Sequence, residues 1–349
     1  MLDIGPLKLD VPVIQAALSG YSDLAMRRIA RMHGAPYTLN EVVLDKLVLV
    51  RGKKQRFITD VPADDHPVGG QLMGAEPTVF AQAAEALVEA GYDCIDINFG
   101  CPVRKVLGRC RGGFLLGRPQ TALDIVRDVV AAVAGRCPVT VKMRRGMDDS
   151  ADSERDFFTI LDGAFEAAVA AVTVHGRTVR QRYQGPSDWS FLAKVKRHVG
   201  DRTILGSGDL FSAPDCVRMM EQTGVDGVTV ARGCIGYPWI FEEVRDLLAG
   251  RPLPDPPSVA AQGRTIRRHY VWAQELYGDK IAHRIMRKFG IKYSELHPAG
   301  LVVRDAFISV KSGADWLAVL DQWYDPGHDW PPVQRRVGPG HLIAAGAEL

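Results

Sequence analysis

The sequence lacks the features that mark several classes of protein. No two of its six cysteines are separated by the two residues typical of a structural zinc site, so we expect reduced thiols and no metal site. No apolar run approaches the roughly 20 residues that span a bilayer. The first residues do not form a basic segment followed by an apolar stretch. These absences predict a cytoplasmic protein that does not enter a membrane.

A large charge of one sign is also lacking. The chain has 43 Lys and Arg against 41 Asp and Glu, so its net charge of +2 does not by itself indicate a nucleic-acid partner. Any basic surface must therefore be local. The hydrophobic fraction of 46% and the charged fraction of 24% are typical of a soluble globular protein.

What the sequence does contain is a repeated alternation of short apolar runs and amphipathic segments. Segments such as Glu76–Ala90, Thr121–Val133 and Ser212–Gln222 have apolar residues at three- and four-residue spacing, as crossover helices do. Eight such units within roughly 240 residues predict a (β/α)8 TIM barrel, since an open doubly wound sheet usually has about five or six strands. The predicted strands are Val11–Leu18, Tyr37–Leu44, His66–Gly74, Cys94–Gly100, Val139–Arg144, Ala171–Arg177, Thr203–Leu210 and Gly227–Arg232.

The composition changes after Leu248, which predicts a second domain. Residues 250–258 are rich in proline and can neither continue a helix nor join a sheet interior, so we interpret them as a linker after a barrel of residues 1–249. Residues 259–324 predict a small helical bundle. Residues 325–349, rich in Pro and Gly, predict a tail that is either mobile or lies over the barrel, and we assign it no function. The helices expected in the bundle are Val259–Tyr277, Lys280–Leu296 and Asp305–Trp323.

Polar side chains and glycines follow the predicted strands at the point where each strand ends. In a TIM barrel these ends form the face that carries the active site. Glycine-rich ends on the last two strands let backbone N–H groups approach a phosphate closely, and Arg232 can supply the countercharge. One such turn often only permits tight packing, but two on adjacent strands favour a phosphate site. The strand-end residues are Gln71, Asn98, Cys101, Lys142, Arg144, His175, Arg177, Ser207, Gly208, Asp209, Ala231 and Arg232.

Several of these residues lie within motifs of one known family. The motifs are Asn98-Phe99-Gly100-Cys101-Pro102, Val141-Lys142-Met143-Arg144, His175-Gly176-Arg177-Thr178, Gly208-Asp209 and Gly236-Tyr237-Pro238-Trp239-Ile240-Phe241. Through them the chain resembles the tRNA-dihydrouridine synthases, in particular the bacterial branch with an Asn-x-Gly-Cys-Pro motif. Chance does not account for several motifs in the correct order, each at a predicted strand end.

The resemblance implies an FMN cofactor. In the family the flavin is held by the loop after the first strand, by a glutamine and a lysine, and by the two phosphate turns, with a histidine close to flavin and pyrimidine. A lysine near flavin N1 and O2 stabilises the negative charge of the reduced ring. The matching positions are Ala17, Leu18, Ser19, Gln71, Lys142, His175, Ser207, Gly208, Asp209, Ala231 and Arg232.

The resemblance also implies the reaction, which is reduction of the C5=C6 bond of a flipped-out uridine in tRNA. Hydride from flavin N5 reaches C6, and Cys101 is expected to donate the proton to C5 on the opposite face. Cys110, in the same loop, is the alternative thiol. Asn98 and Arg177 are candidates to hydrogen-bond the uracil edge. NADPH, or NADH, is the expected electron donor.

A basic surface is expected on the helical segment. From residue 263 to residue 292 there are eight Lys and Arg against two Asp and Glu. Two trios have i, i+3, i+4 spacing, which places each trio on one helix face; they are Arg264, Arg267 and Arg268, and Arg284, Arg287 and Lys288. Charged faces are usually only solvated, but beside a uridine-reducing barrel this one predicts contact with tRNA phosphates, for which we select the second trio.

Some alternatives stay open at this point. Ala17, Ser207 and Ala231 stand where the family has proline, asparagine and glycine, which leaves FMN affinity undetermined. A barrel that reduces a free pyrimidine, an RNA-binding protein without catalysis, and an enzyme acting on ribosomal RNA are the rival hypotheses. We expect a monomer.

Overall fold

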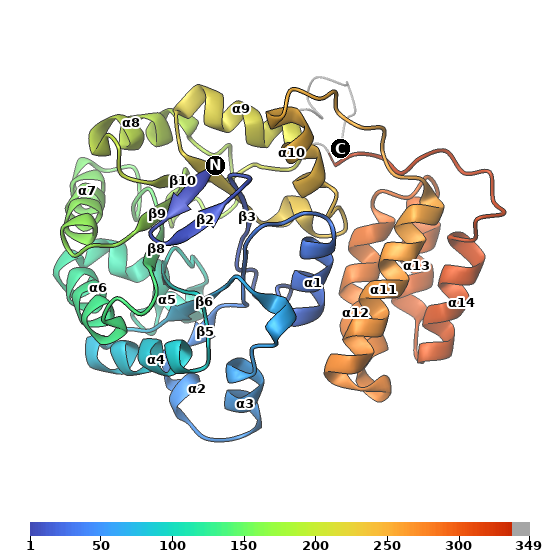
Figure 1. The fold of residues 1–349 in the computed structure, drawn as a ribbon, viewed down its shortest axis with the longest axis horizontal. Helices are drawn as coiled ribbons and strands as arrows, with labels where there is room; N and C mark the ends of the chain where they lie inside the picture. The colour runs from blue at the N-terminus through green and yellow to red at the C-terminus, as the bar shows by residue number, and fades with distance from the viewer. Residues whose placement is uncertain (337–349) are drawn as a thin grey trace.

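The fold is a closed ring of parallel strands surrounded by helices and followed by a separate group of helices (Figure 1). The structure is a computed structural model that describes residues 1–336. Strand β4 pairs with both β3 and β6 and so closes the ring, which confirms the predicted (β/α)8 TIM barrel. The ring consists of β3 (Val13–Gln15), β4 (Thr38–Leu39), β6 (Val68–Met73), β7 (Cys94–Phe99), β8 (Val139–Arg144), β9 (Ala171–His175), β10 (Ile204–Ser207) and β11 (Gly227–Val230). A short strand, β5 (Val43–Leu44), pairs with the end of β6.

A β-hairpin that the sequence patterns did not predict covers the amino end of the barrel. Strand β1 (Leu2–Ile4) pairs antiparallel with β2 (Leu7–Leu9) through a turn in which Gly5 has φ +57°. The apolar side chains of the hairpin are buried in a cluster with the barrel residues Ile14 and Leu205. Because the hairpin seals this end, the barrel opens at the carboxyl ends of its strands.

Amphipathic helices pack around the ring. The predicted helices Glu76–Ala90, Thr121–Val133 and Ser212–Gln222 correspond to α4, α6 and α9. Side-chain caps begin several of the helices; Ser212, for example, accepts a hydrogen bond from the backbone N–H of Asp215 and forms a capping box with it. The helices around the barrel are α1 (Leu24–Met32), α2 (Asp45–Leu49), α3 (Lys53–Thr59), α4 (Pro77–Glu89), α5 (Arg104–Leu107), α6 (Pro119–Val133), α7 (Ala151–Glu166), α8 (Trp189–Val199), α9 (Ala213–Thr223) and α10 (Ile240–Leu248).

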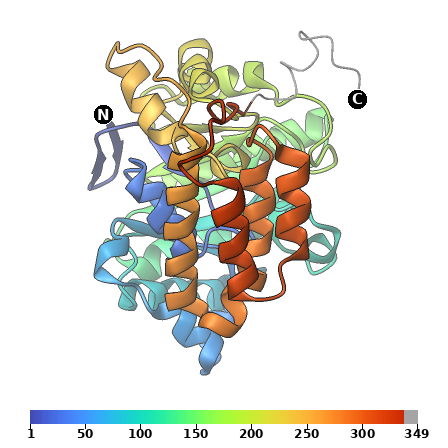
Figure 2. The ribbon, with the colours of Figure 1, turned by 90° about the vertical axis from the view of Figure 1, so that its right-hand side faces the viewer.

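Four helices form the second part of the structure and run side by side (Figure 2). They are α11 (Val259–Tyr277), α12 (Asp279–Ser294), α13 (Gly300–Ser309) and α14 (Gly313–Trp323). The prediction of one helix over Asp305–Trp323 is wrong. Ser312 caps a new helix by accepting a hydrogen bond from the backbone N–H of Asp315, so the predicted single helix is interrupted between α13 and α14.

The start of the predicted tail packs along the seam between the two parts. Val333 is buried and donates its N–H to the carbonyl of Pro257, and Gln334 donates to the carbonyl of Leu296. Arg335 pairs with Glu243 of α10, and Arg336 pairs with Glu295. Residues 325–336 are therefore part of the folded structure, whereas the rest of the predicted tail lies outside the described residues. Within residues 1–336, no helix is long and apolar enough to cross a membrane.

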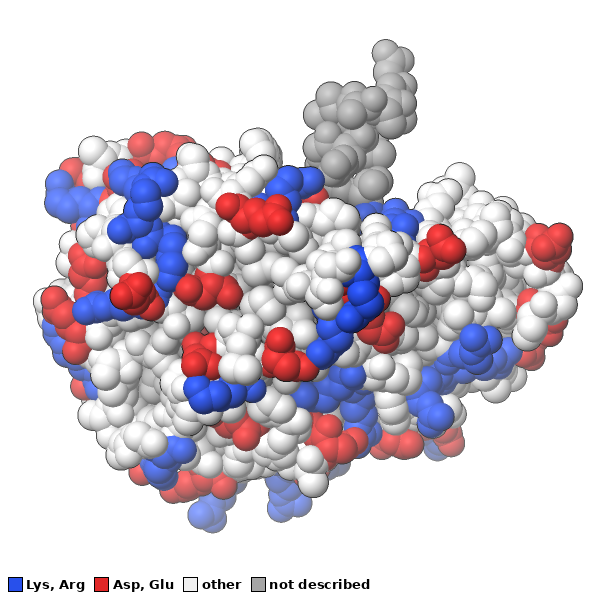
Figure 3. All heavy atoms as spheres, turned by 45° about the horizontal axis from the view of Figure 1, so that its top comes forward, with Lys and Arg blue, Asp and Glu red and all other residues white. Residues whose placement is uncertain are grey.

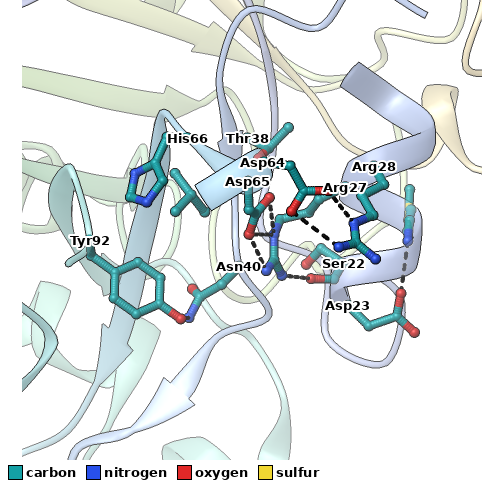
Figure 4. A network of polar contacts seen from close by, with 12 residues as sticks. Ser22, Asp23, Arg27, Arg28, Thr38, Asn40, Asp64, Asp65, His66 and Tyr92 are labelled. Carbon is teal, nitrogen blue, oxygen red and sulfur yellow. Dashed lines mark hydrogen bonds and ion pairs between the residues drawn. The ribbon is translucent and has the colours of Figure 1, made fainter. Parts of the chain in front are cut away.

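A buried ion pair anchors α1 to the segment before β6 (Figure 4). The Arg27 guanidinium donates to the Asp65 carboxylate, with Nε 2.9 Å from Oδ2, and both side chains are almost fully buried. Arg27 also donates to the carbonyl of Ser22 at 2.9 Å. The neighbouring pair of Arg28 and Asp64 has a more exposed carboxylate. Two ion pairs of the same chemistry thus differ in burial.

We expect Asp65→Ala to lower the free energy of unfolding by about 3–5 kcal/mol, because the guanidinium of Arg27 stays buried without its carboxylate. The matched change Asp64→Ala removes a solvent-exposed carboxylate and should cost less than about 1 kcal/mol. Urea denaturation of both variants measures the difference. Equal costs would show that burial does not distinguish the two pairs.

Candidate active site

A cavity of about 210 Å³ opens at the carboxyl ends of the barrel strands. Most residues selected from the sequence line it, because parallel strands bring all their ends to one edge of the sheet. The lining includes Ala17, Leu18, Ser19, Gln71, Asn98, Cys101, Lys142, His175, Ser207, Gly208, Asp209, Ala231 and Arg232.

The loop that carries Cys101 is held by Asn98. The side-chain Oδ1 of Asn98 accepts hydrogen bonds from the backbone N–H groups of Gly100 (3.0 Å) and Cys101 (3.1 Å). The carbonyl of Cys101 accepts from the N–H of Gly113 at 3.1 Å. Gly112 has φ +58°, and a Cβ built there would lie 2.9 Å from Cys101 Cβ. Glycine at positions 112 and 113 is therefore needed for the close packing of this loop around Cys101.

Lys142 and His175 lie in a strongly cationic environment. Burial, followed by the charge of Arg144, lowers the pKa of Lys142 to about 8, while the carboxylate of Asp96 opposes the shift. Burial and the cations Lys142 and Arg144 lower the pKa of His175 well below its usual range, so its ring is neutral at pH 7. Its Nδ1 lies 3.2 Å from the backbone N–H of Arg177 and accepts from it. The proton of His175 is therefore on Nε2, where it can be donated.

The turns after β10 and β11 form the end of the cavity suited to an anion. Gly208 has φ +113°, and an added Cβ would collide with the side chain of Ser187. The backbone N–H groups of Gly208 and Asp209 have no acceptor within residues 1–336. Arg232 is partly exposed, and its guanidinium is 3.8 Å from the Asp209 carboxylate. Free amides beside a guanidinium are the groups that bind a phosphate.

The structure does not place Arg177 in the cavity. Its side chain is 2% exposed, and its guanidinium donates to both carboxylate oxygens of Asp209 at 2.7 Å and to the carbonyl of Gly185. The expectation that Arg177 contacts the uracil edge is therefore not supported. Arg177 instead holds the carboxylate of Asp209.

Arg144 and Tyr183 also line the cavity, although no role was predicted for either. Arg144 donates to the carbonyls of Gly100 (3.0 Å) and Thr178 (2.9 Å), so it ties the Cys101 loop to the loop after β9. Tyr183 is 60% exposed, and its ring lies 5.6 Å from the guanidinium carbon of Arg144 and 5.1 Å from that of Arg232. The motif already contained Arg144, but no pattern in the sequence marks Tyr183, which lies in an irregular loop.

The three basic residues of α12 that were predicted to contact RNA differ in their exposure and contacts. Arg284 is exposed and Arg287 is half-buried. Lys288 is half-buried; its Nζ donates to the carbonyl of Gly20 and lies 5.3 Å from the ring of Tyr21, so it joins α12 to the loop after β3. This contact uses one of its three N–H donors, and its expected contact with RNA stays a prediction.

An exposed basic segment at the start of α3 was missed. Arg51, Lys53, Lys54 and Arg56 have no ion-pair partner in the part of the chain that the structure describes. The segment follows α2, which begins directly after β5. Phe57 stacks on Tyr277 of α11 with ring centroids 5.9 Å apart, so α3 lies beside the four-helix part. On the face in Figure 3, by contrast, basic and acidic side chains are interspersed.

Together the fold and the site define an α/β barrel whose cavity is suited to an anion and is lined by the thiol of Cys101. A model of the family described as "Dihydrouridine synthase (Dus)" matches residues 14–324. A probable tRNA-dihydrouridine synthase of Mycobacterium tuberculosis is 36% identical over 330 residues, covering 92% of this chain and 84% of that protein. A probable tRNA-dihydrouridine synthase of Rickettsia conorii is 34% identical, covering 88% of this chain and 91% of that protein.

The chain therefore belongs to the dihydrouridine synthase family. This confirms the resemblance found in the motifs and the predicted class, a flavin-dependent oxidoreductase.

Two solved structures share the fold. Histamine dehydrogenase from Rhizobium sp. 4-9 has a TM-score of 0.56 at 16% identity, covering 77% of this chain and 50% of that one. A 6-hydroxypseudooxynicotine amine oxidase from Pseudomonas geniculata N1 has a TM-score of 0.57 at 13% identity, covering 76% of this chain and 52% of that one. The chain spans about half the length of these enzymes, and the likeness concerns the fold alone.

Lys142→Met should raise the free energy of unfolding of the flavin-free protein at pH 7 by about 2 kcal/mol, because it removes a charge whose burial is unfavourable. The folded-state pKa of Lys142, about 8, is below its ordinary value of 10.5. Between these values the unfolded state binds more protons, so the wild type gains stability relative to the variant as pH rises. Urea denaturation between pH 7 and pH 10 measures this. A constant difference across that range would contradict the low pKa.

Proposed function

We propose that this protein is a tRNA-dihydrouridine synthase that reduces the C5=C6 bond of a flipped-out uridine, with FMN as cofactor, NADPH as electron donor and Cys101 as proton donor. The observation that carries the proposal is the convergence of Cys101, Lys142 and His175 on the cavity that also contains the anion-binding turns. The names of the relatives support tRNA as the substrate.

The residues present fit FMN. Its phosphate would be held by the free amides of Gly208 and Asp209 and by Arg232, and Ala231 lies in the same wall. Gln71 and Lys142 would hold the ring, together with the loop Ala17-Leu18-Ser19. Bound FMN supplies the hydride for C6 of the uracil. Ser207 and Ala231 differ from the family pattern, but the phosphate contacts proposed here use backbone N–H groups and Arg232.

Cys101 is better placed than Cys110 to donate the proton to C5. Cys101 lines the cavity, and hydrogen bonds at both its N–H and its carbonyl hold its backbone. Cys110 is exposed and is not part of the cavity lining. A general acid must lie within reach of the atom it protonates, so geometry favours Cys101.

Neutral donors in the cavity would orient the uracil. His175 presents an Nε2–H, and Asn98 has one side-chain N–H beyond the one that it donates to Gln71. Both can donate to uracil carbonyl oxygens without adding a buried charge. Asn98 thus keeps the role expected from the sequence, while its Oδ1 holds the Cys101 loop.

RNA would be held by cations around the cavity rather than by α12 alone. A base in a folded RNA has to leave its stack to enter a deep pocket, so the surrounding surface must grip the backbone. Arg284 and Arg287 on α12 and the exposed segment of Arg51, Lys53, Lys54 and Arg56 lie on the two parts of the molecule that meet at Phe57 and Tyr277. This arrangement favours RNA over a free pyrimidine as substrate. The cytoplasmic location, the monomeric state and the use of NADPH or NADH as electron donor stay predictions.

Cys101→Ala should bind FMN and tRNA as the wild type does but lose about two to four orders of magnitude in dihydrouridine formation, because it lacks the general acid. Single-turnover oxidation of the reduced flavin by unmodified tRNA measures the step. Cys110→Ala is the matched control and should stay active. A Cys101→Ala enzyme as fast as wild type would exclude Cys101 as the acid, and a protein that cannot bind FMN would overturn the proposed function.

Replacing Lys53, Lys54 and Arg56 together by alanine should weaken tRNA binding and reduce the slope of log affinity against log salt by up to about three, roughly 0.9 for each phosphate that is no longer neutralised. FMN content should not change. The matched control replaces Lys194, Arg197 and Arg202, on and just after α8, away from α3 and the helical group (Figure 1). An equal effect of the two triple variants would show that the α3 segment contributes only net charge.

A further inference from the structure

A carboxylate inside the barrel contributes only its charge, near Lys142, to the site described above. Asp96 lies on β7, is 2% exposed and does not line the cavity. Its Oδ1 accepts a hydrogen bond from the Thr140 hydroxyl at 2.6 Å, and its Oδ2 accepts from the side-chain Nε2 of Gln71 at 2.6 Å. Burial raises the pKa of Asp96. An apolar residue would fill this position at less cost, so its hydrogen bonds require an explanation.

These hydrogen bonds continue from Asp96 to the Cys101 loop. Gln71 donates to Asp96, and its Oε1 accepts from the side-chain Nδ2 of Asn98 at 2.7 Å. The Oδ1 of Asn98 accepts from the backbone N–H of Cys101 at 3.1 Å. Every link runs in the same direction, because each side-chain amide accepts on the side of the loop and donates on the side of Asp96.

The direction of these hydrogen bonds is selected at both ends, by the backbone N–H groups of the loop and by the buried carboxylate of Asp96. A carboxylate facing Gln71 can only accept, so it selects the orientation in which Gln71 donates to Asp96. With that orientation Asn98 must present its oxygen to the loop. In the reverse orientation the NH2 group of Asn98 would face the N–H groups of Gly100 and Cys101, and two donors cannot bond to each other.

We propose that Asp96 is a positioning residue that fixes the Cys101 loop through Gln71 and Asn98. The proposal deepens the proposed function, on which its importance for catalysis rests. The hydrogen-bonded chain itself can be tested through the reactivity of the Cys101 thiol, without RNA or NADPH. Its failure is therefore distinguishable from failure of the proposed activity.

This series of hydrogen bonds also predicts which second substitution restores the position of the Cys101 loop. In Asp96→Asn the new amide can donate to Gln71 as well as accept from it, so the buried end no longer selects the direction and only the N–H groups of the loop still favour it. In the double variant Asp96→Asn with Asn98→Asp, the carboxylate lies at the loop end of the hydrogen-bond series instead of at its buried end. Gln71 can then accept from residue 96 and donate to residue 98, whose carboxylate still accepts from Gly100 and Cys101. Every buried polar group regains a partner.

The experiment measures the rate of iodoacetamide alkylation at each cysteine of the purified flavoprotein by peptide mass spectrometry. Asp96→Asn should change the rate at Cys101 by about fivefold or more, the equivalent of one hydrogen bond. Rates at Cys110 and Cys137 should stay constant and exclude a general loosening of the fold. The double variant should return the Cys101 rate to within about twofold of wild type, which a loss of packing alone would not do.

Thr140→Val is the matched control, because it removes the other hydrogen bond of Asp96 and leaves the chain to the loop intact. Its Cys101 rate should equal that of wild type. If Asp96→Asn yields no soluble protein, urea denaturation provides a second comparison, in which the double variant should be more stable than Asn98→Asp alone. An unchanged Cys101 rate in Asp96→Asn, an equal change at Cys137, or a double variant no better than its single variants would overturn the proposal.

Discussion

The closure of the parallel sheet is the constraint on which the rest of the molecule depends. Strand β4 is only two residues long, yet it bridges β3 and β6 and completes the ring. Because all strands of the ring point the same way, residues from distant parts of the sequence, such as Gln71, Lys142 and Arg232, line a single cavity. The hairpin β1–β2 covers the opposite end, so the chemistry has one entrance.

Closure also concentrates positive charge, and this determines the character of the site. Burial lowers the pKa of Lys142, Arg144 and Arg232, and a neighbouring cation adds to each shift: Arg144 for Lys142, and Arg177 for both Arg144 and Arg232. Acidic partners offset part of this charge: Asp209 pairs with Arg177, and Asp96 lies near Lys142. The remaining imbalance favours an anionic ligand, and the same field keeps His175 neutral. Burying these cations is thus unfavourable for the stability of the free protein, and a bound anion would reduce that cost.

The two parts of the molecule are joined by polar contacts rather than by the linker alone. Lys288 of α12 donates to Gly20, and Tyr277 of α11 donates to Asp23 at 2.9 Å. Both acceptors lie just after the loop that lines the cavity with Leu18 and Ser19. RNA bound to the four-helix part would therefore contact helices that are hydrogen-bonded to the segment next to the cavity wall.

The sequence by itself determined the features that depend on local pattern. Alternating apolar runs predicted the barrel strands, and glycines and polar residues at strand ends, with the Asn-x-Gly-Cys-Pro motif, predicted the cavity residues and the family. Only the tertiary structure decided how charges are partnered, because ion pairs join residues far apart in the chain. It buried Arg177 against Asp209 and tied Lys288 to Gly20, while it left Lys53 and Lys54 exposed and, within residues 1–336, without an ion-pair partner. It also broke the last predicted helix at Ser312, and it brought Asp96, which reads in the sequence as an ordinary strand residue, into contact with Gln71 and so with the Cys101 loop.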